Sequence, residues 1–99
     1  MQMTEFDARA FKQAGVDALR RGDFVKAREQ FEKVLPSAHV DGLTWLGLAA
    51  ACRGLSDKPA TIAAVDKVLA LEPRNVRALI MKGDHLIETG DVPSALSFY

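Results

Sequence analysis

The sequence predicts an all-α fold, a right-handed superhelical solenoid of antiparallel helix hairpins, from three observations. Apolar residues return every three or four positions through six segments, the period of an amphipathic helix. Glycine, proline and aspartate lie in the short stretches between those segments. Glycines also recur in three pairs with six residues between the members of each pair. The pairs are Gly15 with Gly22, Gly47 with Gly54, and Gly83 with Gly90.

The spacing of these pairs predicts a tandem repeat with a period of 34. The first pair starts at position 15 and the third at position 83, and their difference is twice 34 (83 − 15 = 2 × 34). The middle pair is displaced by two positions from this period. We therefore expect a local two-residue insertion in the second unit, within residues 55–60. Three units follow, over about residues 8–41, 42–75 and 76–99, within a single domain.

Six helices are expected, and the last is incomplete. The second glycine of each pair is predicted to end a helix in the left-handed conformation. Asp23, Asp57 and Asp91 follow those glycines and are suited to cap the next helix start. Pro36 and Pro73 follow the second helices of their units, where they stop them. Pro59 and Pro93 fall in first turns, which tolerate proline. The predicted helices cover residues 5–21, 24–35, 41–53, 59–71, 76–89 and 92–99.

The core is expected between the hairpins. Gly15, Gly47 and Gly83 lie inside helices, where glycine costs about 1 kcal/mol relative to alanine. Their presence predicts that the backbone of a neighbouring helix comes close at these points. Phe31, which recurs as Tyr99 two periods later, is predicted to wedge between hairpins.

The repeat resembles the tetratricopeptide repeat (TPR) family. The middle unit contains Trp45-Leu46-Gly47, and it ends in Leu69-Ala70-Leu71-Glu72-Pro73, similar to the end of the second helix in that family. This resemblance covers almost the whole chain. It implies a scaffold for protein–protein interactions, in which the first helix of each unit lines a concave groove that binds a partner protein or peptide.

The resemblance also implies which side chains face the groove. These lie one position into each first helix and at helical steps after it. They are Arg9, Lys12, Val16, Leu19, Asp41, Thr44, Leu48, Ala51, Arg77, Ile80, Asp84 and Ile87. The cations lie at the two ends and an apolar floor lies between them, so a peptide with an apolar centre and an acidic group would fit. The alternative is that these charges only solvate the helix surfaces.

Enzymatic chemistry is not expected within this chain, and no metal or cofactor is expected. His39 and His85 have no partner at a metal-ligand spacing. Cys52 is the only cysteine, and it is either a mildly activated thiol or a small packing residue. Thirteen basic and thirteen acidic residues give a formal net charge of zero, which disfavours nucleic acid, and no basic amphipathic stretch suggests a membrane surface. A cytoplasmic protein is the expectation.

The third unit leaves two further alternatives open. Since the last predicted helix ends after about two turns, we expect the chain to be the N-terminal part of a longer protein. That protein could be an enzyme, such as a hydroxylase or transferase, whose catalytic domain follows. Alternatively, the chain is a self-associating adaptor that forms a homodimer through its uncapped C-terminal hairpin.

Overall fold

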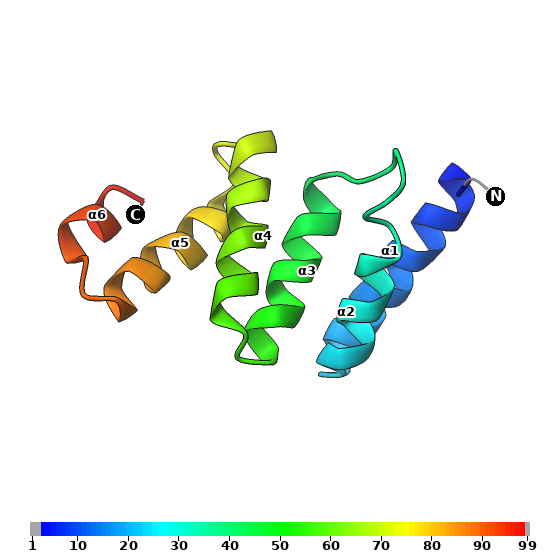
Figure 1. Cartoon of the computed structure of the whole chain (residues 1–99), viewed down its shortest axis with the longest axis horizontal. Helices are drawn as coiled ribbons and strands as arrows, with labels where there is room; N and C mark the ends of the chain where they lie inside the picture. Colours follow the sequence, from blue (N-terminus) through cyan, green and yellow to red (C-terminus); the bar gives the residue numbers. More distant parts are fainter. Residues whose placement is uncertain (1–2, 99) are drawn as a thin grey trace.

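Six helices form three antiparallel hairpins in the computed structural model, which describes residues 3–98 (Figure 1). The hairpins stand side by side along a molecule 47 Å long, and each packs against the next one in the chain. No strand occurs within residues 3–98, and the predicted all-α solenoid is confirmed. The helices are α1 (Glu5–Arg20), α2 (Phe24–Glu32), α3 (Gly42–Gly54), α4 (Lys58–Leu71), α5 (Val76–Glu88) and α6 (Val92–Leu96).

A polar side chain caps the start of every helix. Asp23, Asp57 and Asp91 accept hydrogen bonds from backbone N–H groups in the first turns of α2, α4 and α6, so the predicted caps are confirmed. Each carboxylate satisfies one of the donors that a helix leaves unpaired at its start. Thr4 and Asp41 do the same in reciprocal capping boxes at α1 and α3.

The turns inside the hairpins show that the repeat length is constant. Gly22 and Gly90 have positive φ angles of 75° and 86°, as predicted, but the equivalent residue of the second hairpin is Ser56, with φ of 60°. These three residues are spaced by 34 (56 − 22 and 90 − 56). Gly54 is instead the last residue of α3. The predicted insertion at residues 55–60 is therefore wrong, because the middle glycine pair does not occupy the positions of the outer two pairs.

Ser56 provides a direct test of this register. A residue with a Cβ in the left-handed region is strained relative to glycine by about 1–2 kcal/mol. Glycine relieves this strain, but part of the gain is lost because glycine also has more freedom in the unfolded chain. We expect Ser56→Gly to raise the free energy of unfolding by about 0.5–1 kcal/mol, measured by urea denaturation. A loss of stability in this variant would contradict the assigned turn.

Phe31 fills the junction of the first two hairpins. Its side chain is fully buried, and its ring lies against Gly15 of α1 and Gly47 of α3. A Cβ added to Gly15 would lie 2.7 Å from the ring. The predicted wedge is confirmed, whereas the predicted close approach of a helix backbone at Gly15 and Gly47 is corrected: these glycines make room for an aromatic ring.

Two helices, α2 and α6, end well before their predicted last residues, whereas the bounds of the other four agree to within one residue. Beyond Glu32 the chain continues as a tighter turn, in which Val34 N–H bonds to the carbonyl of Phe31 at 3.0 Å. Such i to i−3 bonds end a helix when a proline follows, here Pro36. The sixth helix ends at Leu96, and the predicted match of Tyr99 to Phe31 lies outside the described residues.

Candidate functional site

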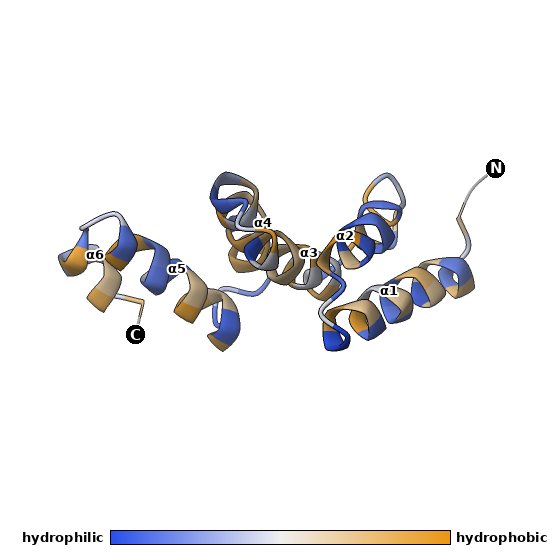
Figure 2. Cartoon of the chain, turned by 90° about the horizontal axis from the view of Figure 1, so that it is seen from below, coloured by the Kyte–Doolittle hydropathy of each residue, from blue (hydrophilic) through white to orange (hydrophobic). Residues whose placement is uncertain are grey.

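The first helices of the hairpins lie on one side of the molecule. Figure 2 shows α1 and α5 along the same edge, with α3 set back between them and α2 and α4 toward the opposite edge, while α6 lies at the end of the molecule beside α5. α1 packs against α3, whereas the main contacts of α5 are with α4 and α6. The resulting surface over α1, α3 and α5 is the candidate groove.

The structure corrects the predicted groove residues on α3. Thr44 and Ala51 are fully buried and Leu48 is 8% exposed, so these three belong to the core and not to the groove floor. The physical reason is the register error of two positions. Each residue advances about 100° around a helix. A register error of two residues therefore places a side chain on nearly the opposite face of the helix.

Moving the register by two positions identifies the groove side of α3. One period after the α1 positions stand Leu43, Leu46, Ala50 and Arg53. Leu43 is 49% exposed, Arg53 is exposed, and Leu46 and Ala50 are half-buried. The positions on α1 and α5 are unchanged by the correction. We define the groove by the side chains of Arg9, Lys12, Val16, Leu19, Leu43, Leu46, Ala50, Arg53, Arg77, Ile80, Asp84 and Ile87. Asp41, which the uncorrected register placed among them, is the N-cap of α3.

The exposure of the side chains on α5 and α1 agrees with this assignment of the groove. Arg77 is exposed, and Ile80 and Ile87 are each 45% exposed. Val16 and Leu19 are half-buried and pack against the core below them. The centre of the groove is therefore aliphatic, and its charged residues lie around that centre.

A hollow of about 460 Å³ lies at one end of the groove, between α1 and the start of α3. Arg9, Lys12 and Leu43 line it, together with Asp41 and the loop residue His39. The predicted residues Arg9, Lys12 and Asp41 are thus brought together. Leu43 belongs to the same hollow but was missed by the glycine-based register.

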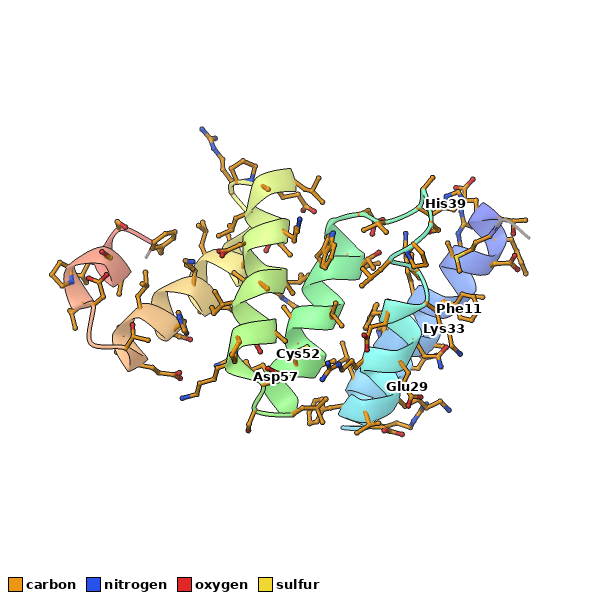
Figure 3. The ribbon with its side chains drawn as sticks, viewed as in Figure 1. Phe11, Glu29, Lys33, His39, Cys52 and Asp57 are labelled. Atoms are coloured by element: carbon orange, nitrogen blue, oxygen red, sulfur yellow. The ribbon has the colours of Figure 1, made fainter. Side chains whose placement is uncertain are left out.

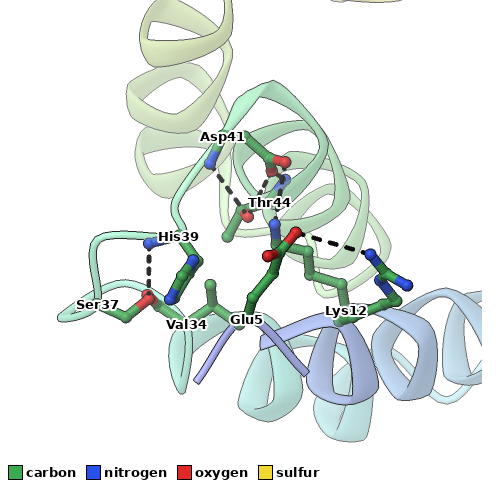
Figure 4. A network of polar contacts seen from close by, with 8 residues as sticks. Glu5, Lys12, Val34, Ser37, His39, Asp41 and Thr44 are labelled. Atoms are coloured by element: carbon green, nitrogen blue, oxygen red, sulfur yellow. Dashed lines mark hydrogen bonds and ion pairs between the residues drawn. The ribbon is translucent and has the colours of Figure 1, made fainter. Parts of the chain in front are cut away.

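An ion pair ties α1 to α3 beside this hollow. Lys12 Nζ lies 3.0 Å from Asp41 Oδ2, and the Thr44 hydroxyl donates to Asp41 Oδ1 at 2.8 Å (Figure 4). Burial of Asp41 opposes its charge, but the hydrogen bonds from Lys12 and Thr44 outweigh that effect and lower the pKa of Asp41. Asp41 therefore caps α3 and also links it to α1 of the preceding repeat unit.

The lowered pKa gives a prediction for stability. A carboxylate whose folded-state pKa is depressed stabilises the fold above its unfolded pKa, about 4, and loses that contribution as pH falls through the folded-state value. Asp41→Asn keeps a capping side chain but removes the charge. We expect it to be less stable than the wild type at pH 7 by less than about 1 kcal/mol, since the Asp41 side chain is 53% exposed. In urea unfolding this difference should shrink below about pH 4; a difference independent of pH would exclude the charge as its cause.

A second hollow of about 250 Å³ lies toward the other end of the groove, where α3, α4 and α5 meet. Ile62 and Met81 are among its apolar lining residues. Arg53 and Asp84 also line it and form an ion pair of 3.8 Å between α3 and α5. Both pair members are exposed enough to rearrange around a ligand at small energetic cost.

Another hollow, of about 290 Å³, lies between α2, α3 and α4, away from the groove. Trp45, Cys52, Ala63 and Lys67 are among its lining residues. Cys52 lies near the end of α3 (Figure 3) and is 2% exposed. Burial raises the pKa of the Cys52 thiol despite the nearby Arg28 charge, so the activated-thiol alternative is wrong and the packing role holds.

Each of the two histidines lines one of the hollows. His39 lies in the loop before α3, and its backbone N–H donates to Ser37 Oγ at 3.1 Å (Figure 4). His85 lines the hollow between α3, α4 and α5. Across residues 3–98 no group of three or more His, Cys, Asp or Glu side chains is placed to hold a metal ion. None of the described helices is long and apolar enough to cross a membrane.

Comparison with known proteins identifies the fold but not a family. No protein-family model and no curated protein sequence matches the chain. Among solved structures, PcrH in complex with the chaperone binding region of PopB is similar, with a TM-score of 0.87. The match covers 99% of this chain and 80% of that chain at 17% sequence identity. The chain therefore has a tetratricopeptide-like helical repeat fold.

Proposed function

We propose that this chain is a protein-interaction module that holds a segment of another protein in the groove over α1, α3 and α5. The observation that carries the proposal is the row of exposed or half-buried aliphatic side chains along the groove. Leu43 and Ile80 expose 49% and 45% of their surface there. Exposed apolar surface rimmed by charge is typical of binding sites for polypeptide segments.

The similarity to PcrH supports the same proposal. That structure holds PcrH together with the chaperone binding region of PopB, so a repeat fold of this shape accommodates part of another protein. We extend from it only the class of ligand, a polypeptide segment. The groove residues of this chain then decide which segments bind.

The test uses selection from a random dodecapeptide library displayed on phage, with the intact chain as target. Leu43→Asp combined with Ile80→Asp should reduce the recovery of bound phage at least about tenfold, because two charges would then replace exposed apolar side chains of the groove. The matched control is Val25→Asp with Leu71→Asp. These two side chains are each 57% exposed and lie on second helices, α2 and α4.

Circular dichroism should show equal helix content in both double variants. Equal losses of binding in the groove variant and its control would place binding elsewhere on the surface. Failure to recover any peptide above background would contradict the proposed function itself.

Self-association through the third hairpin stays a prediction of the sequence. Ile87, Val92 and Leu96 expose between 45% and 66% of their surface on α5 and α6. Light scattering over a concentration series tests it: a concentration-independent dimer would support a homodimer, and a monomer would exclude one at those concentrations.

A further inference from the structure

The groove carries an excess of positive charge in a chain that is neutral as a whole. Four of the groove residues are basic, namely Arg9, Lys12, Arg53 and Arg77, and one is acidic, Asp84. The whole chain has thirteen basic and thirteen acidic residues. A ligand in this groove therefore meets local positive charge, although the net charge of the whole chain is zero.

Neighbouring carboxylates already compensate three of these cations. Arg9 pairs with Glu5 at 3.7 Å. Lys12 pairs with Asp41 at 3.0 Å, and Arg53 pairs with Asp84 at 3.8 Å. At these three cations a carboxylate of the ligand would have to displace a carboxylate of the chain.

Arg77 is the groove cation that has no such partner. Within residues 3–98 it forms no ion pair with any carboxylate. Glu72, close to it in sequence, is engaged elsewhere: its Oε1 accepts a hydrogen bond from Asn75 at 3.3 Å, and its carboxylate lies against Gly42. The guanidinium of Arg77 is thus available to a ligand.

Two aliphatic groove residues are related to Arg77 by the helical turn and by the repeat. Ile80 lies three positions further along α5, one helical turn away. Leu43 occupies the position on α3 that Arg77 occupies on α5, one period earlier in the sequence. Both are among the exposed aliphatic residues of the groove. A ligand that reaches Arg77 therefore also meets aliphatic surface.

We propose that the segment held in the groove is acidic and aliphatic, with an aspartate or glutamate that pairs with Arg77 and with aliphatic neighbours that pack on Leu43 and Ile80. This inference rests on the proposed function and adds the chemistry of its ligand. Arg77 offers two parallel N–H donors to one carboxylate, a geometry that lysine cannot provide. A basic segment would instead be repelled at this position.

Arg74 provides a matched control within the chain. It is exposed like Arg77 and takes part in none of the ion pairs among the described residues. It lies in the turn between α4 and α5 and not at a groove position. Arg74→Glu and Arg77→Glu change the net charge equally, so any difference between them reports location and not overall charge.

The experiment repeats the random dodecapeptide selection on the wild type, Arg77→Glu and Arg74→Glu, and sequences the recovered pools. We expect aspartate and glutamate to be enriched, together with leucine, isoleucine and valine, in the pools from the wild type and from Arg74→Glu. The acidic enrichment should disappear from the Arg77→Glu pool while the aliphatic enrichment remains.

The strongest wild-type peptide then serves as a fluorescent probe for anisotropy titration. Replacing its conserved acidic residue with the neutral amide should weaken binding about two- to fivefold to the wild type and to Arg74→Glu, but leave binding to Arg77→Glu unchanged. The two- to fivefold difference should also fall in high salt, because an exposed pair is screened.

The outcomes separate this inference from the proposed function. Aliphatic enrichment without acidic enrichment in the wild-type pool would overturn the charge assignment and leave the groove as the binding site. Acidic enrichment that survives Arg77→Glu would overturn it as well. Light scattering provides a further outcome. If the wild type is a dimer and the variant with Leu43→Asp and Ile80→Asp is a monomer, a second copy of the chain occupies the groove. That result would also overturn the proposal.

Discussion

Phe31→Ala is expected to lower the free energy of unfolding by about 3–5 kcal/mol. The ring is fully buried and contacts units on both sides of the first junction, so alanine would leave a cavity lined by Gly15 and Gly47, which have no side chains to fill it. Domains of this size are stable by roughly 5–15 kcal/mol, so the loss is a large share of the total. Urea unfolding followed by circular dichroism measures it.

The control for Phe31→Ala is Phe6→Ala. Phe6 is 79% exposed on α1, and its removal should change the free energy of unfolding by less than about 0.5 kcal/mol. A loss under about 1 kcal/mol for Phe31→Ala would contradict the packing of the first two hairpins around this ring.

Gly47→Ala is expected to destabilise the fold, although alanine is the better helix former by about 1 kcal/mol. A Cβ at this position would lie inside the contact distance of the Phe31 ring. Overpacking of this kind costs about 1–3 kcal/mol, and it exceeds the gain in helix propensity. The net loss should be up to about 2 kcal/mol in urea unfolding.

A double-mutant cycle isolates the cause of that loss. In a Phe31→Leu background the ring is absent, so Gly47→Ala should become neutral or stabilising by up to about 1 kcal/mol. The same loss in both backgrounds would show that something other than Phe31 requires glycine at position 47.

The helices could be predicted from the sequence because the capping chemistry is local. Asp23, Asp57 and Asp91 are both strong N-caps and spaced by 34, so they indicate where the second helices begin. The structure confirms these starts to within one position. Proline at 59 and 93 supports the same boundaries.

The register of the second unit could not be predicted from its glycines, because they serve tertiary contacts. Gly47 makes room for Phe31, and Gly54 makes room for the ring of Phe24. The left-handed turn that glycine marks in the other hairpins is made by Ser56, whose sequence gives no such signal. The aspartates at 23, 57 and 91, with their constant spacing, were the better guide to register.

The misassignment of Thr44 has the same origin. The glycine-based register placed it in the groove, but its hydroxyl is satisfied by Asp41, which allows it to be fully buried. The packing of Leu48 and Ala51 of α3 into the core with the first hairpin shows which face of α3 is covered. On α1 and α5 the glycine-based register agrees with the left-handed turns at Gly22 and Gly90, so the groove positions predicted there are kept in the proposal.

The most direct test of the groove is chemical-shift mapping of the ¹⁵N-labelled chain with a peptide recovered from the display selection. The proposed function predicts that amide shifts concentrate on α1, α3 and α5, with the largest changes near Leu43, Ala50 and Ile80. Shifts concentrated instead around Trp45, Ala63 and Lys67, at the hollow between α2 and α4, would place the binding site on the opposite face and contradict the groove.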